Sequence, residues 1–175
     1  MSAPSGGPYP MAPLIRFTLV SLYLALVLPL PWLVAEAPTG LLATAVLAGL
    51  LLVLAATSER VEIDASGIRV GHPDWCSWLL RRGWSLPWQA VTGLSAIGTS
   101  QGGRVFYLRS ANGAYLVPQR VARFDQFVEE LAGYSGLDIS SIGRISPPWT
   151  YQLLAILSGT MLLGELAWGL FALQG

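Results

Sequence analysis

The residues best suited to chemistry lie in one short stretch near the middle of the sequence. His72, Asp74 and Cys76 alternate, so an extended chain would place their side chains on one face. Such ligands could hold a metal ion, and a Cys–His pair could act as a nucleophile. The stretch has no further ligands at a metal-site spacing and no oxyanion-hole motif. We therefore predict a solvated loop, no metal site, and a protein that is not an enzyme.

A single acidic residue, Glu165, interrupts the last apolar segment, residues 149–173. An ionisable group in hydrocarbon is costly unless it is paired or protonated, which makes it a candidate functional site. We predict that Glu165 contacts a partner chain, a bound pigment or a cofactor metal. The alternative is that it is neutral or reaches water through a gap between helices. Beyond a pigment or lipid, we predict no cofactor.

A loop rich in tryptophan combines Trp75, Trp78 and Trp84 with Arg81 and Arg82. Indole rings favour the headgroup level of a membrane, and guanidinium groups bind phosphates, so the loop is a candidate for the membrane interface. Alternatively, the tryptophans fill the core of a domain or form a protein-binding patch. Two Arg are fewer than the cluster expected for phosphoinositide recognition.

Small residues recur at four-residue spacing in two apolar segments. Gly40, Thr44 and Ala48 lie in one, while Gly159 and Gly164 each follow another small residue by four positions in the last. This spacing lets helix backbones approach closely. We expect these residues to pack the helices of this chain against one another, with docking on a larger membrane complex as a second use of the same surface.

The composition favours a membrane protein. The chain has 175 residues, of which 53% are hydrophobic and 11% charged, against roughly 25% charged in an ordinary soluble domain. The formal net charge is +0, so no overall field attracts nucleic acid. A single Cys excludes an intrachain disulfide and a four-Cys metal site.

Three apolar segments predict three transmembrane helices. Residues 14–35 and 39–57 lie close enough in sequence to form an antiparallel hairpin, and residues 149–173 form the third span. At 1.5 Å per residue, the first segment would cover a hydrocarbon core of roughly 30 Å. Residues 1–13, which are rich in Pro and Gly and carry no charge, are predicted to be a flexible tail.

The middle of the chain, residues 58–136, has the patterns of a small antiparallel β domain. Polar and apolar residues alternate, Asn112-Gly113 predicts a β-hairpin, and residues 124–131 form an amphipathic helical stripe that Gly133 or Gly136 would end. Residues 137–148 are predicted to be a linker. The expected strands are Arg60–Asp64, Ile68–Val70, Trp88–Ile97, Arg104–Arg109 and Tyr115–Val117.

This pattern resembles the bacterial pleckstrin-homology-like (PH-like) domains that follow a transmembrane hairpin. The resemblance rests on Val61–Ile68, on Leu86–Val91 with its Pro-Trp strand start, and on the Asn112-Gly113 hairpin followed by a helix. It implies a binding or scaffolding module without catalytic residues. The predicted fold is therefore an α+β membrane protein: three transmembrane helices plus a small antiparallel β-sheet or barrel of the PH-like kind with a C-terminal amphipathic helix.

The distribution of Arg predicts the topology. Arg16 begins the first segment, Arg60 follows the second and Arg144 precedes the third, whereas the connection between the first two has Glu36 and no basic residue. We therefore predict that the N-terminus and the domain are cytoplasmic and the C-terminus lies across an inner, plasma or thylakoid membrane.

A domain held at both ends by helices is better placed to recognise a membrane protein than a soluble ligand. We predict a non-catalytic accessory subunit or assembly factor of a larger integral membrane complex, photosynthetic if the source is. The partners are that complex and membrane lipids, not nucleic acid. The alternatives are a lipid-binding or envelope-stress protein and a small subunit of a membrane enzyme or transporter.

Overall fold

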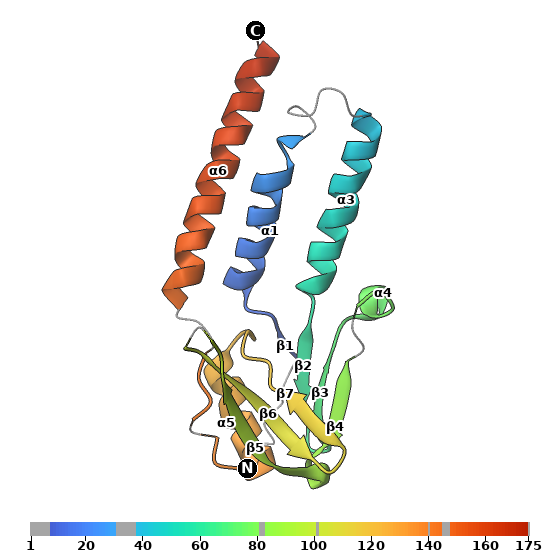
Figure 1. The fold of residues 1–175 in the computed structure, drawn as a ribbon, viewed down its shortest axis with the longest axis vertical. Coiled ribbons are helices and arrows are strands. Elements are labelled where there is room, and N and C mark those ends of the chain that lie inside the picture. Colours follow the sequence, from blue (N-terminus) through green and yellow to red (C-terminus); the bar gives the residue numbers. More distant parts are fainter. Residues whose placement is uncertain are drawn as a thin grey trace. The chain divides into compact units, whose positions relative to one another are not determined.

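The protein divides into two compact units. The computed structural model describes residues 8–30, 38–80, 83–100, 102–139, 141–144 and 148–174. One unit combines Met1–Ala12 with Ser58–Ser146 and is called the strand domain. The other combines Pro13–Thr57 with Pro147–Gly175 and is called the helical unit. Figure 1 shows the elements of both.

The strand domain contains two antiparallel sheets and one long helix. The first sheet has the strand order β1-β2-β3-β4 and the second the order β5-β6-β7. The strands are β1 (Tyr9–Pro10), β2 (Arg60–Ile63), β3 (Gly67–Gly71), β4 (Trp84–Pro87), β5 (Val91–Gly98), β6 (Arg104–Ser110) and β7 (Gly113–Leu116). The helices are α4 (Asp74–Ser77), the 3₁₀ turn η1 (Trp88–Ala90) and α5 (Phe124–Ser135).

Local sequence signals are confirmed at the hairpin and at the end of α5. Strands β6 and β7 pair through Ser110 and Gly113, with Ala111 and Asn112 forming the turn between them. Gly113 has φ 145° and Gly136, which caps α5, has φ 65°, values that favour glycine. The predicted strand at Trp88–Ile97 begins later, since a 3₁₀ turn precedes β5.

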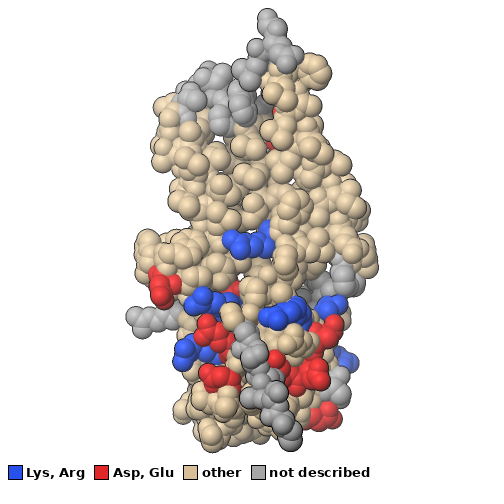
Figure 2. Space-filling view, turned by 180° about the vertical axis from the view of Figure 1, so that it is seen from behind, with Lys and Arg blue, Asp and Glu red and all other residues tan. Residues whose placement is uncertain are grey.

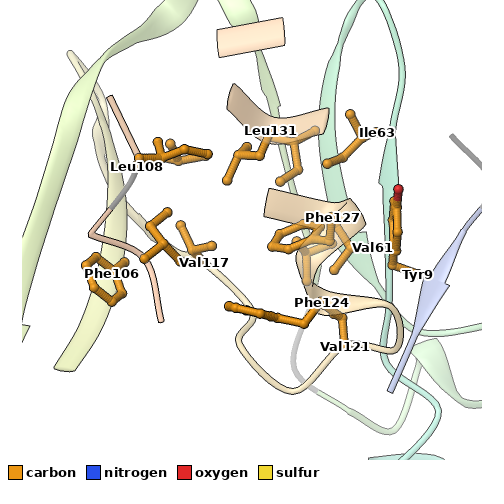
Figure 3. Packing of buried hydrophobic residues seen from close by; sticks show 14 of the residues in the cluster. Tyr9, Val61, Ile63, Phe106, Leu108, Val117, Val121, Phe124, Phe127 and Leu131 are labelled. Carbon is orange, nitrogen blue, oxygen red and sulfur yellow. The ribbon is translucent and has the colours of Figure 1, made fainter. Parts of the chain in front are cut away.

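The core of the strand domain lies between the two sheets and α5. Phe127 and Leu131 point from α5 toward Val61 and Ile63 of the first sheet, and Leu108 extends from the second (Figure 3). All five side chains are buried. The apolar stripe predicted at residues 124–131 is therefore the buried face of the helix.

The N-terminal residues differ from the flexible tail predicted for residues 1–13. Tyr9 and Pro10 pair with Val61 and Arg60, and the Tyr9 side chain is fully buried. Its ring meets Phe127 edge to face, with 5.5 Å between the centroids. Pairing with β2, which lies far along the sequence, gives hydrogen-bond partners to backbone groups that have none within their own segment. Tyr9 and Pro10 thus belong to the sheet and Met11 forms an isolated bridge with Val121, whereas residues 1–7 lie outside the described residues.

The segment predicted as a linker, residues 137–148, packs on the strand domain in its described part. Ile139 and Ile142 are buried in the core. The Gln119 side chain donates hydrogen bonds to the Arg104 carbonyl at 3.1 Å and the Gly143 carbonyl at 2.6 Å. These contacts fix the path of the chain after α5.

The prediction of three transmembrane helices is wrong. Within the described residues, the structure has one helix long and apolar enough to cross a membrane, at Trp149–Phe171 of α6 (Pro148–Gln174). The other two, α1 (Pro13–Val27) and α3 (Thr39–Ala56), are shorter apolar helices. The protein is α+β, with two small antiparallel sheets, but it is not a three-helix membrane protein.

Proline explains why the first helix is shorter than its apolar segment. Helix α1 ends at Val27, and Leu28 and Pro29 form a turn. Proline has no N–H to donate, and its ring clashes with the carbonyl four residues earlier, so Pro29 ends the helix. The 15 residues of α1 rise by roughly 22 Å, short of the hydrocarbon thickness.

Within the helical unit, α1 packs against both α3 and α6. Polar side chains join α1 to α6: the Thr18 hydroxyl donates to the Tyr151 carbonyl at 3.2 Å, and the hydroxyls of Ser21 and Ser158 lie 2.7 Å apart. All three hydroxyl side chains are buried. Toward α3, the Tyr23 hydroxyl donates to the Val46 carbonyl at 2.8 Å.

Candidate functional site

The outward surface of the helical unit is apolar. Only 11% of the α6 window that could cross a membrane is buried within the structure. Figure 2 shows charged side chains gathered over the strand domain, while the surface of the helical unit is almost entirely uncharged. Such a continuous apolar surface indicates contact with lipid or with another protein rather than with water. The exposed large side chains on α3 and α6 include Leu41, Leu47, Leu51, Ile156, Leu163, Trp168 and Phe171.

The glycines of α3 divide between two faces. A Cβ on Gly49 would collide with the Tyr23 ring of α1, whereas a Cβ on Gly40 would meet no described atom within 4 Å. At 100° per residue, the stripe of Gly40, Thr44 and Ala48 lies roughly opposite Gly49. All three stripe residues are exposed, and Thr44 bonds only to the carbonyl of Gly40 in its own helix.

The predicted small-residue pairs of α6 also leave room for close approach. A Cβ on Gly159 or Gly164 would meet no described atom within 4 Å. The contact between α1 and α6 runs instead through Ser158. The expectation that these small residues pack this chain's own helices is therefore wrong for Gly40, Gly159 and Gly164 in the described structure.

Glu165 lies on α6 and is half-buried. Its Oε2 atom is buried and has no hydrogen-bond partner among the described residues. The role of Glu165 in binding a cofactor or partner stays a prediction.

The Trp-rich loop separates into an exposed part and a buried part. Trp75, Trp78 and Leu79 are 54%, 79% and 50% exposed, and are called the Trp patch below. Trp84 instead packs against the core and lies 5.2 Å from the Tyr115 ring, centroid to centroid. Its pairing with Val70 in the sheet fixes this position. Arg81 and Arg82 lie outside the described residues.

The alternating His72, Asp74 and Cys76 do not share a face. Helix α4 begins at Asp74, which is exposed, whereas Cys76 is buried with its Sγ 3.2 Å from the Ser58 hydroxyl. Among the described residues, no group of three His, Cys, Asp or Glu side chains could hold a metal ion. The stretch is a structured connection rather than a solvated loop.

A cluster around Tyr9 escaped the sequence analysis. Arg123 has φ 50°, in the left-handed region, and its guanidinium lies 5.1 Å from the centre of the Tyr9 ring. Glu130 is 8% exposed, and neither its Oε2 nor the Tyr9 hydroxyl has a partner among the described residues. Burial, and then the adjacent Glu130 carboxylate, raises the pKa of Tyr9 above its ordinary value. This cluster holds β1 on α5.

Two open hollows on the strand domain lack the features of a ligand site. One, of about 230 Å³, is smaller than most small-molecule sites. The other, of about 450 Å³, lies along α5 alone. The first is lined by residues that include Met11, Glu59, Val61, Leu116 and Arg120, and the second by Gln126, Glu129, Glu130, Gly133 and Tyr134.

Comparison with known proteins shows one clear relative. The uncharacterized protein slr0269 of Synechocystis sp. is 38% identical over 169 residues, which cover 92% of this chain and 81% of the relative. The chain belongs to the family of this Synechocystis protein. No protein-family model matches the chain. No solved structure matches it. The resemblance to PH-like domains therefore stays a prediction.

Proposed function

We propose that the protein is a non-catalytic accessory subunit or assembly factor that docks on a larger integral membrane complex. The observation that carries the proposal is the exposed stripe of Gly40, Thr44 and Ala48 on the face of α3 turned away from α1. In a photosynthetic organism, we expect the complex to be a photosynthetic one.

The chemistry of the stripe favours a helix over lipid as its neighbour. Lipid tails cover leucine and glycine equally well, so small residues gain nothing from a lipid-facing position. A second helix does gain, because its backbone can approach closely and make many van der Waals contacts. Leu47 and Leu51 lie in the neighbouring row along one side of the stripe and are exposed, so a helix docked on the stripe would also contact them.

The proposed topology takes α6 as the helix that spans the membrane. Arg144 precedes α6 and Arg60 follows α3, whereas the described part of α6 beyond Glu165 carries no charge. The positive-inside rule then places the strand domain in the cytoplasm and the end of the chain on the other side. We propose this orientation for an inner, plasma or thylakoid membrane.

A subunit of a membrane enzyme or transporter is a second candidate function, favoured by Glu165 alone. A carboxyl group in a membrane-spanning helix is often part of an ion or substrate path. Its Oε2 has no described partner within this chain. Replacing Glu165→Gln should then abolish the activity of the host complex while leaving its assembly intact. A purely structural subunit would leave that activity unchanged.

The docking proposal is tested by filling the stripe. We would tag the chain, solubilise native membranes in mild detergent and identify co-purifying proteins by mass spectrometry. The double variant Gly40→Leu/Ala48→Leu should lose a partner complex that the wild type retains at a fixed ratio. The single variants Ala48→Leu and Ala43→Leu form a matched pair, since each replaces an exposed alanine of α3 by leucine, the first on the stripe and the second, as control, off it.

Two outcomes would contradict the docking proposal. Recovery of the wild type only as a single or self-associated small particle would exclude a stable host complex. Retention of the complex by Gly40→Leu/Ala48→Leu at the wild-type ratio would exclude the stripe as the docking face. Loss of the complex in the Ala43→Leu control as well would show that bulk anywhere on α3 disturbs the helical unit, and would remove the support that the stripe gives.

A further inference from the structure

The register of the first sheet places the Trp patch beside the connections to the helices. Arg60 pairs with both Pro10 and Gly71, so the end of β1, the start of β2 and the end of β3 lie together where the strands end. This end of the strands is called the edge of the sheet below. From this edge the chain leads through Met11 and Ala12 into α1, and it arrives there from α3 through Ser58 and Glu59. The β3–β4 connection, which carries α4, emerges from the same edge (Figure 1).

Two close contacts fix the patch at this edge. Cys76 is buried, and its Sγ lies 3.2 Å from the hydroxyl of Ser58, the residue directly after the α3 C-cap. At the other end of the connection, a Cβ on Gly83 would collide with the Val70 carbonyl oxygen, so only glycine allows this closure. With Cys76 turned inward, Trp75, Trp78 and Leu79 are left on the outside.

The polar groups of the patch are suited to a partly apolar environment. The indole N–H of Trp78 donates to the Trp75 carbonyl at 3.0 Å, so this ring can leave water without losing a hydrogen bond.

We propose that the Trp patch inserts into the headgroup region of the bilayer that receives α6. The occupant of the patch is lipid, because the patch shares its sheet edge with the connections to the apolar helices. Indole rings prefer this level of the membrane. The inference rests on the proposed membrane insertion of the helical unit, but it is independent of any partner complex.

Fluorescence quenching by brominated lipid tests the proposal on the full chain. The purified protein would be reconstituted in phosphatidylcholine vesicles with or without bromine on the acyl carbons nearest the headgroup. Replacing Trp75→Phe/Trp78→Phe should lower the quenched tryptophan intensity, since it removes two of the seven tryptophans, both placed by the proposal at the interface within reach of the bromine.

A matched control exists at the opposite edge of the same sheet. Trp88 follows β4 next to the β2–β3 turn, where its indole N–H donates to the Asp64 carbonyl at 2.7 Å. Its ring stacks on Tyr134 with 5.9 Å between the centroids. Replacing Trp88→Phe should therefore leave the quenched intensity unchanged.

The outcomes separate this inference from the proposed function. Equal quenching of wild type and Trp75→Phe/Trp78→Phe would overturn lipid insertion of the patch. If the same variant instead loses a co-purifying complex from native membranes, the occupant is a protein. If no tryptophan of the chain is quenched, the helical unit itself is not in lipid. The vesicles contain no partner, so failure to find a host complex leaves the quenching result intact.

Discussion

The two units of this protein differ in the side chains that they bury and expose. In the strand domain, aromatic and aliphatic side chains such as Phe127 and Leu131 are fully buried, and the charges lie on the surface (Figures 2 and 3). In the helical unit, the hydroxyls of Thr18, Ser21 and Ser158 are buried while large apolar side chains are exposed. The two units therefore present different surfaces, charged on the strand domain and apolar on the helical unit.

The physical basis of this contrast is the kind of interaction that stabilises each unit. In water, burying apolar surface is the dominant favourable term, so a domain collects it inside. In lipid, apolar side chains gain nothing by leaving the solvent, and helices associate through close packing and hydrogen bonds. The Ser21–Ser158 and Tyr23–Val46 contacts are the bonds expected in the second case.

The largest expected difference between the units is in the stability lost when a phenylalanine is replaced by alanine. Phe127→Ala should lower the free energy of unfolding by about 3–5 kcal/mol, because it opens a cavity in a fully buried core. Phe17→Ala on α1, where the ring is 56% exposed, should cost less than about 0.5 kcal/mol in detergent. Urea unfolding of the solubilised chain measures both. Equal losses would show that the outer face of α1 is a packed core.

A difference in stability of intermediate size is expected between alanine variants of two glycines of α3. Gly49→Ala places a methyl group against the Tyr23 ring and should cost about 1–3 kcal/mol, since the ring must move and its hydrogen bond to Val46 is strained. Gly40→Ala should cause no loss, because its Cβ would meet no described atom. Thermal unfolding in detergent compares them. A stable Gly49→Ala variant would contradict the packing of α1 against α3.

A smaller effect is expected for the polar contact inside the helical unit. A double-mutant cycle with Ser21→Ala and Ser158→Ala should give a coupling energy of about 0.6 kcal/mol, the average for such bonds in membrane helices. Thr160→Ala provides the control, since its exposed hydroxyl bonds only to Leu157 of its own helix. Zero coupling would mean that the hydroxyls do not hold α1 to α6.

The smallest expected effect is a pH dependence in the strand domain. The Ser66 hydroxyl and backbone N–H hold the pKa of Asp64 below its ordinary value. The unfolded chain therefore binds this proton first, so the contribution to stability is present above about pH 4 and is lost as pH falls through the folded pKa. Asp64→Asn should flatten the fall in unfolding midpoint below that pH. Asp74→Asn, with the same change of charge, serves as the control.

Patterns within a few residues predicted much of the fold. The alternation at Arg60–Asp64, the hairpin near Asn112 and the helix that ends at Gly136 all appear in the structure. The proposed site was predicted only in part: the exposed Trp75 and Trp78 were named, but Trp84 was grouped with them. Strand pairing with β3 decides that Trp84 faces the core, and alternation alone does not reveal which partner a strand will have.

Neighbouring residues along the chain are enough to predict where the apolar segments lie, which stretches alternate and where a glycine ends an element. The pairing of Tyr9 in the sheet, the burial of Glu130 and the contact of Gly49, but not of Gly40, with another helix depend on the tertiary structure. These features arise from contacts between residues far apart in sequence. A local pattern determines which face of a segment is apolar and which is polar. The tertiary structure determines whether each face contacts solvent, a helix or a strand.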